Sequence, residues 1–229
     1  PTITSTVFKR HILWLVQHYH LISLQEYLSG SMNRELNGRK LIALTFDDGY
    51  QITFQCVASF LIENDIPATF FVSTGHLERG ELLWFSYLKA LCFEKLYVTI
   101  KVDQQVFPTQ TLKERRNAWY AIAASAKASG DPVGFCKRLA KTYPIPPEIS
   151  IKFVGMTHKQ LVEAGRSDLL EIGGHTVTHP YLDQVPRNMQ EQEILDGKCA
   201  LAGLSGKPIR YFAYPGGEYN HDTIELVKA

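Results

Sequence analysis

The sequence predicts an α/β fold built on a parallel sheet, and two observations lead to this prediction. Short runs rich in β-branched and aromatic residues alternate with stretches whose apolar residues recur at helical spacing. The connections between these stretches are short, and strand, helix, strand in succession implies parallel strands. Such an order suits either a barrel-like or an open sheet, and both alternatives remain open at this point.

Periodicity and glycine positions predict the first elements. The polar stretch 33–40 predicts a loop, and the nearly continuous apolar run 40–47 predicts a strand buried on both faces. The other predicted elements are a helix at 6–20, a short strand and helical turn that stop at Gly30, a helix at 50–64 and a strand at 66–74.

The stretch of about 77–156 is less regular, and we expect it to be an insertion within a single domain that covers 1–229. Its prolines at 143–150 argue against regular structure there. The stretch contains a predicted helix at 84–93, an alternating strand-like segment at 96–102 and a helix at 112–128.

The strand and helix rhythm returns at Thr157, which forms a capping-box pattern with Gln160. The predicted elements that follow are a helix to Arg166, a strand at 168–175, a helix at 188–202, a strand at 209–215 and a helix that begins at Asn220.

Composition excludes several classes of protein. The net charge is +1, so no strong field draws the chain to nucleic acid or anionic lipid. No apolar run approaches the roughly 20 residues that span a bilayer, and no signal peptide is recognisable. The four cysteines form no C-x-x-C pair, so we expect buried free thiols, Cys56 and Cys199 among them. Free thiols favour a cytoplasmic location, and a cell-envelope or secreted one stays open.

Side chains that could bind a metal or take part in catalysis lie where the predicted strands end. Asp47 and Asp48 follow one strand, and the sequence HTVTH, which carries His175 and His179, follows another. Because the carboxyl ends of parallel strands form one rim, we expect these side chains to lie there. A turn for Asp47 and Asp48 and a pair of surface histidines are the alternatives.

The histidine spacing predicts a metal site. Residues four apart lie on one face of a helical turn, so the imidazoles of His175 and His179 could reach one ion. Two histidines and one aspartate leave coordination positions open for water and substrate. Zinc suits these ligands, as do Co²⁺, Ni²⁺ and Fe²⁺. The second aspartate could then take a proton from the attacking water.

The motifs TFDDG, HTVTH and FAYPGG, in this order, resemble the first three motifs of the polysaccharide deacetylase family. This family is also called the NodB-homology domain or carbohydrate esterase family 4. The flanking sequences IPATFFV and EIGGHTVTHPYL are similar to the family as well, and the resemblance covers about 41–74 and 157–229.

The resemblance implies a distorted (β/α)7 barrel and metal-dependent removal of acetyl groups from the N-acetylated sugars of a polysaccharide or glycan. By motif, Asp47 would be the general base, and the metal ligands would be Asp48, His175 and His179. The implied supporting residues are Thr176, whose hydroxyl supports the loop, Tyr214 and Pro215, which border the substrate, and Gly216, whose N–H stabilises the oxyanion.

The chain departs from the family pattern in three places. Ala213 replaces an arginine that orients the base in many members, and Arg210 is expected on the opposite strand face. Gly216 replaces a tyrosine. The family's late Leu-x-x-His motif, which supplies the general acid, is not found, and His221 is expected to be a solvated surface residue. We therefore expect this chain to lack the last strands of the domain, either because it is a fragment or because its gene is degraded.

Two rival functions remain, an O-acetyl carbohydrate esterase and a non-catalytic carbohydrate-binding remnant. Aromatic residues at the start of the insertion also allow two interpretations. Trp84, Phe85 and Tyr87 could stack on sugar rings or pack in the core, and packing is the commoner outcome.

Overall fold

The computed structural model describes residues 4–30, 35–78 and 82–228. The chain divides into two compact units. The first comprises Pro1–Val72, Met156–Gly174 and Lys198–Ala213, and the second comprises Ser73–Gly155, His175–Gly197 and Tyr214–Ala229.

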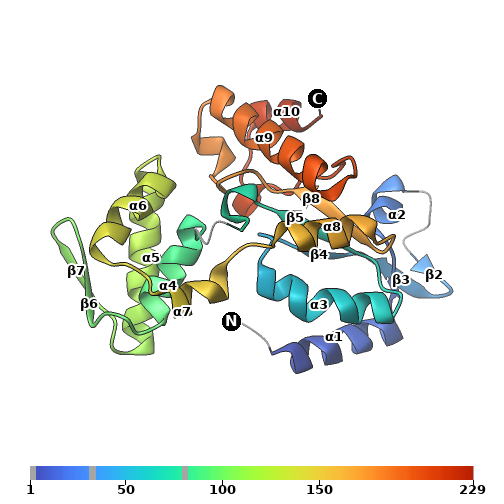
Figure 1. Cartoon of the computed structure of the whole chain (residues 1–229), viewed down its shortest axis with the longest axis horizontal. Coiled ribbons are helices and arrows are strands. Elements are labelled where there is room, and N and C mark those ends of the chain that lie inside the picture. Colours follow the sequence, from blue (N-terminus) through green and yellow to red (C-terminus); the bar gives the residue numbers. More distant parts are fainter. Residues whose placement is uncertain (1–3, 31–34, 79–81, 229) are drawn as a thin grey trace. The chain divides into compact units, whose positions relative to one another are not determined.

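A three-stranded parallel sheet is the framework of the first unit (Figure 1). Its strands, in spatial order, are β4 (Leu44–Phe46), β5 (Ala68–Val72) and β8 (Leu170–Gly174). The helix α3 (Gln51–Glu63) connects β4 to β5, and α8 (His158–Arg166) precedes β8. The predicted parallel α/β arrangement is therefore confirmed.

The predicted barrel is not closed among the described residues. Within the part of the chain that the structure describes, the sheet continues beyond β8 only as a bridge between Gly174 and Phe212, so the strand predicted at 209–215 is wrong. The described residues thus form an open mixed α/β fold with a parallel sheet.

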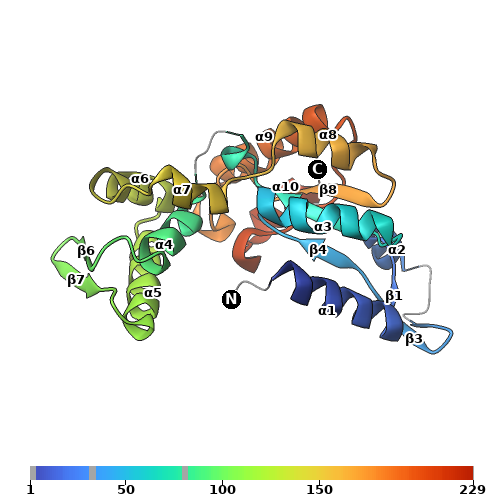
Figure 2. The ribbon, with the colours of Figure 1, turned by 60° about the horizontal axis from the view of Figure 1, so that its bottom comes forward.

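Aromatic side chains fill the space between the sheet and its helices. The rings of Phe46 and Phe70 stack at 4.9 Å, and Phe54 of α3 meets Phe70 edge-on at 5.3 Å. The predicted first helix is confirmed as α1 (Ser5–His18), whose Phe8 ring lies 6.0 Å from that of Phe46. Figure 2 shows α1 and α3 close to β4. Burial of these rings helps to stabilise this unit.

A β-hairpin replaces the predicted loop before β4. Strand β2 (Glu35–Leu36) pairs antiparallel with β3 (Arg39–Ile42). Asn37 and Gly38 between them both have left-handed φ, 50° and 75°, as a two-residue hairpin turn requires. The loop prediction is wrong for this hairpin, and its residues 33–34 lie outside the described residues.

The run predicted as one buried strand at 40–47 is interrupted at Ala43. Its first part, β3, pairs in parallel with β1 (His20–Leu21), whereas β4 joins the larger sheet. Strand β4 is half-buried or exposed rather than buried on both faces. As predicted, a helical turn, α2 (Leu24–Ser29), follows β1, and Gly30 caps it with a φ of 65°.

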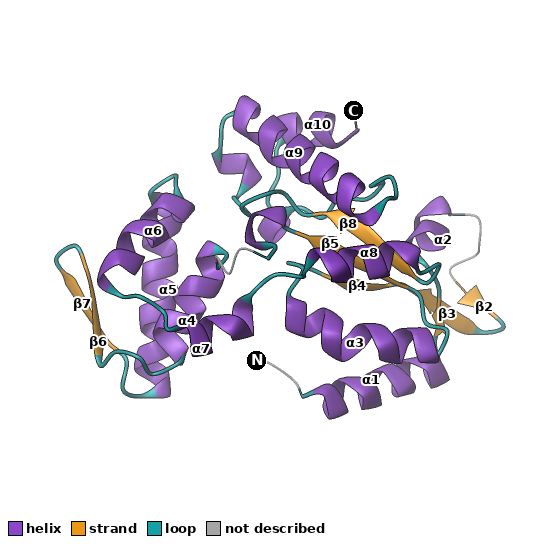
Figure 3. Ribbon diagram, in the orientation of Figure 1, coloured by secondary structure: helices purple, strands orange, loops and turns teal. Residues whose placement is uncertain are grey.

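The second unit contains a helical core with its own hairpin (Figure 3). The predicted helices are confirmed as α4 (Trp84–Phe93) and α5 (Leu112–Ala128). The other elements of this region are β6 (Thr99–Val102), β7 (Gln105–Pro108), α6 (Pro132–Thr142) and α7 (Pro147–Ser150). The prediction that the prolines at 143–150 exclude regular structure is wrong for α7. It forms because Pro147 occupies the first helical position, where no N–H is needed.

The last two helices are α9 (Arg187–Ser205) and α10 (His221–Lys228). Asn220 caps α10 as predicted, since its side chain accepts from the N–H of Thr223 at 3.0 Å. No helix among the described residues combines the length and apolar character that crossing a bilayer would require.

All four cysteines are free, but two of them are not buried as predicted. Cys199 is exposed because the buried side of α9 follows Gln190, Ile194 and Leu201. Cys56 is half-buried. Burial raises the pKa of both remaining thiols, Cys92 and Cys136, to about 12.

We expect the four thiols to react in two classes. Cys56 and Cys199 should react with Ellman's reagent in the native protein, because the thiolate is the nucleophile and neither of these two thiols is buried. Cys92 and Cys136 should react only after unfolding, because their thiols stay protonated and enclosed. Titration with and without denaturant checks this, and four rapid equivalents in the native protein would contradict it.

Candidate metal centre

The turn after β4 places the two aspartates. Asp48 and Gly49 both have left-handed φ, 72° and 74°, so the strand ends abruptly after Phe46. A Cβ on residue 49 would lie 2.6 Å from Val72 Cγ1, so only glycine fits against the end of β5. The N–H of Met156 donates to the carbonyl of Gly49 at 2.9 Å and holds the turn. Asp48 is half-buried and Asp47 is exposed.

His175 follows directly after β8. Its side chain is 2% exposed, and its carbonyl accepts from Ser73 Oγ at 2.7 Å. The preceding Gly174 is fixed by backbone hydrogen bonds to Tyr211 and Ala213, at 2.8 and 3.0 Å. The first imidazole therefore extends from a rigid strand end, as the sequence predicted.

The segment from His175 to His179 is a loop and not the predicted helical turn. Thr176 and His179 have left-handed φ values of 65° and 59°, which a right-handed helix excludes. The Thr176 hydroxyl accepts from the N–H of His179 at 3.0 Å and donates to the carbonyl of His175 at 2.5 Å. The two imidazole centroids lie 4.8 Å apart. Thr176 is 1% exposed, and its hydroxyl supports the loop through these two hydrogen bonds.

Neighbouring segments hold the same loop from outside. The N–H groups of Thr74 and Gly75 donate to the carbonyls of Thr176 and Val177, at 3.1 and 2.7 Å. A Cβ on residue 75 would lie 2.6 Å from the Val177 oxygen, so this approach needs glycine. Backbone pairing with 74–75 therefore fixes the middle of the loop.

Trp84 supports the loop that carries His179. It is 5% exposed, it packs within the core around α4, and its indole N–H donates to the carbonyl of His179 at 2.9 Å. Tyr87 is buried as well, and the ring of Phe85 lies 4.5 Å from that of His179. The packing interpretation is therefore favoured, because Trp84 and Tyr87 are both buried.

Ser73 and Glu193 also contact this loop and were not predicted. Glu193 accepts hydrogen bonds from Val177 and Thr178. No local pattern connects Ser73 to a segment 102 residues away, or Glu193 to one 15 residues away. A search for acidic or hydroxyl residues near the histidine motif would have returned many candidates of equal merit.

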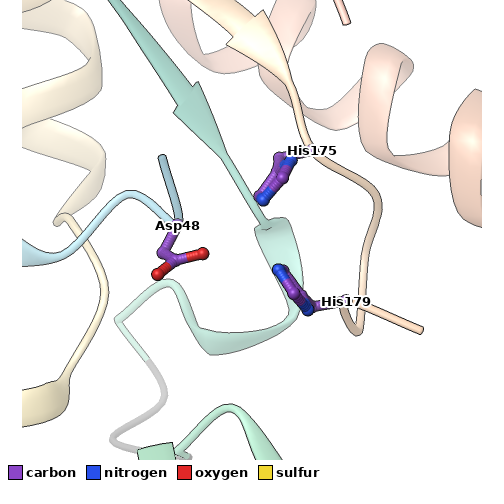
Figure 4. A group of neighbouring side chains, drawn as sticks. All are labelled: Asp48, His175 and His179. Carbon is purple, nitrogen blue, oxygen red and sulfur yellow. The ribbon is translucent and has the colours of Figure 1, made fainter. Parts of the chain in front are cut away.

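Three side chains present metal-ligand atoms to one another (Figure 4). One ligand atom each of Asp48, His175 and His179 lies within 4.8 Å of the other two. Imidazole nitrogens with a carboxylate oxygen form a donor set that suits Zn²⁺ and other divalent transition metals. Burial of both imidazoles lowers the competition from bulk water. These residues therefore fit the metal that the sequence predicted.

A second acidic and histidine group occurs on α10 and is a weaker candidate. It consists of His221, Asp222 and Glu225. Arg187 Nη1 lies 2.6 Å from Asp222 Oδ1 and 2.8 Å from Glu225 Oε2, so a guanidinium already neutralises both carboxylates. The His221 side chain is 85% exposed, in agreement with its predicted role as a solvated residue.

The third motif adopts the glycine-dependent geometry expected of it. Gly216 is exposed with a φ of 63°, and a Cβ there would lie 2.9 Å from Tyr181 Cε1. Pro215 is buried, whereas Tyr214 is half-buried with its ring stacked on Tyr219 at 4.7 Å. Of the pair Tyr214 and Pro215, only Tyr214 has appreciable surface for a sugar to contact.

A cavity of about 390 Å³ in the first unit lies at the other end of the strands. It is lined by the starts of β5 and β8, at Ala68 and Leu170, whereas Asp48 and His175 follow the carboxyl ends of their strands. Burial raises the pKa of Glu171 in this cavity, and Arg210 opposes the shift. Arg210 thus acts on Glu171.

The family model for polysaccharide deacetylases matches residues 34–229. The chain therefore belongs to the polysaccharide deacetylase family. This family contains hydrolases. No curated protein matches the sequence.

Solved structures agree with this assignment. The chain is similar to IcaB from Ammonifex degensii, with 20% identity, a TM-score of 0.60 and coverage of 99% of this chain and 72% of that one. It is also similar to the Streptococcus pyogenes deacetylase PplD in complex with acetate, with 20% identity, a TM-score of 0.52 and coverage of 99% and 69%. The chain is similar as well to a de-N-acetylase from Aggregatibacter actinomycetemcomitans, with 17% identity, a TM-score of 0.54 and coverage of 99% of this chain and 74% of that one. At these identities the likeness establishes the fold.

We expect Gly49→Ala to destabilise the protein by about 1–3 kcal/mol, because the new Cβ meets Val72 and an L-residue is strained at this φ. Gly203→Ala is the matched control. It lies in α9 with open space around it and should stabilise by up to about 1 kcal/mol. Urea unfolding of both variants checks this, and equal midpoints would show that the turn tolerates a side chain.

Proposed function

We propose that the protein is a metal-dependent hydrolase that removes acetyl groups from the N-acetylated sugars of a polysaccharide or glycan. The observation that carries the proposal is the convergence of Asp48, His175 and His179, whose ligand atoms lie within 4.8 Å of one another. Membership of the polysaccharide deacetylase family supports the reaction class. Zn²⁺ is the metal that we favour, and Co²⁺, Ni²⁺ or Fe²⁺ would suit the same ligands.

Each residue has a role in this proposal. Asp48, His175 and His179 hold the metal, which when bound activates water and polarises the acetyl carbonyl. Asp47 is exposed and adjacent in sequence to Asp48, and its carboxylate takes the proton of the attacking water. The N–H of Gly216 donates to the oxyanion that develops on the carbonyl oxygen. Tyr214 contributes to the surface that receives the sugar.

Removal of one imidazole should strongly weaken metal binding. After treatment with chelator, calorimetric titration with Zn²⁺ should show one site of sub-micromolar affinity. His179→Ala should lower this affinity by more than about 100-fold, since loss of an outer-shell contact alone costs about 10–100-fold. His158→Ala, at an exposed position on α8, is the control and should leave the affinity unchanged. A folded wild-type protein that binds no Zn²⁺ would refute the proposal.

Replacement of the proposed base should separate binding from turnover. Asp47→Asn should keep the Zn²⁺ affinity within a few-fold and lower acetate release from N-acetylated oligosaccharides by about 10²–10⁴-fold. Release of acetate from O-acetylated sugars alone would identify an esterase instead. Binding of oligosaccharides without any acetate release would identify a carbohydrate-binding protein.

A further inference from the structure

Glu193 of α9 forms three hydrogen bonds with the loop that carries the two imidazoles. Its Oε2 accepts from the N–H groups of Val177 and Thr178, at 2.8 Å each. Its Oε1 accepts from the hydroxyl of Thr178 at 2.6 Å. One carboxylate thus binds both residues that separate Thr176 from His179.

The backbone of the loop creates this binding site. Thr176 has left-handed φ, and the N–H groups of the next two residues point to the same place. Successive N–H groups of this kind form a concave nest for an anion, and the Glu193 carboxylate occupies it. The left-handed conformation is unfavourable for a β-branched residue such as Thr176. The loop therefore needs ties of this kind to hold its shape.

The position of α9 brings Glu193 within reach. Gly197, one turn further along, lies against the same loop, where a Cβ would be 3.2 Å from the backbone carbon of Thr176. Gln190, one turn earlier, is anchored because its side chain donates to Val185 O at 3.0 Å and accepts from the Thr223 hydroxyl at 2.6 Å. The helix is thus fixed on both sides of Glu193.

The chemistry of these contacts favours a carboxylate. The two N–H groups only donate, the Thr178 hydroxyl can donate or accept, and an ionised carboxylate only accepts. A glutamine of the same size could accept from the two N–H groups through its single oxygen and donate from its NH₂ group to the Thr178 hydroxyl. Glu193→Gln therefore preserves the volume and removes the negative charge that strengthens these hydrogen bonds.

We propose that Glu193 is a positioning residue that sets the separation of the His175 and His179 imidazoles by fixing residues 177 and 178. The inference rests on the proposed function in that these imidazoles hold the metal. Glu193 acts through the loop and needs no contact with metal or substrate.

Co²⁺ is the probe for the test, since its visible spectrum reports ligand geometry. The full chain is stripped with chelator and titrated with Co²⁺. Glu193→Gln should bind Co²⁺ about 10–100-fold more weakly and with an altered visible band, because the charge-assisted hydrogen bonds behind a ligand are weakened. Glu191→Gln, the same substitution at an exposed position of the same helix, is the matched control and should resemble the wild type.

A second pair of variants tests the same contact in case Glu193→Gln does not fold. Thr178→Val removes one donor to Glu193 while keeping the branched shape, and should weaken Co²⁺ binding several-fold. Thr178→Ser keeps the hydroxyl and should restore wild-type binding, a rescue that a general loss of stability would not give. Urea unfolding of the metal-free proteins identifies variants that are merely unstable.

The outcomes separate the two proposals. A wild-type protein that binds Co²⁺, together with unchanged affinity and spectrum in folded Thr178→Val and Glu193→Gln, overturns the role of Glu193 alone. A folded wild-type protein that binds no Co²⁺ overturns the proposed function and this role with it.

Discussion

The hydrogen bonds that fix the loop from His175 to His179 are the interaction on which the candidate site depends. Two of its residues have left-handed backbone conformations, so the loop does not hold its shape through local preference. Its carbonyls accept from Ser73, from the backbone of 74–75 and from the Trp84 indole. Its N–H groups are satisfied by Thr176 and Glu193. A metal site on a loop can be well defined when its backbone is bound on every side.

Glycine at three close approaches makes this arrangement sterically feasible. Gly49 accommodates the end of β5, Gly75 accommodates the Val177 carbonyl, and Gly197 lets α9 approach the loop. In each place a Cβ would lie within 3.2 Å of another residue. Close approach of two backbones needs a residue without a side chain. The packing around the ligands is therefore set as much by missing side chains as by those present.

The sequence was a good guide to elements whose signal is local, and a poor one elsewhere. The capping box at Thr157 and the helical periodicity of α3 predicted their helices correctly. The Asn37–Gly38 turn carried a recognised hairpin signal that the polar composition around it concealed. The spacing of His175 and His179 led to convergence through a helical turn, whereas tertiary hydrogen bonds produce it. Such long-range contacts leave no periodic pattern, so they could not be predicted.

The hydrogen bond from the Trp84 indole to the His179 carbonyl limits which parts of the helical core can be removed without affecting the candidate site. Trp84 belongs to the helical core around α4 and α5, which contains none of the three motifs TFDDG, HTVTH and FAYPGG. Truncating that region would remove a donor from the backbone of a proposed ligand. The first turn of α4 is therefore hydrogen-bonded directly to the backbone of the candidate site. One helix thus serves both the core of the second unit and the candidate metal centre.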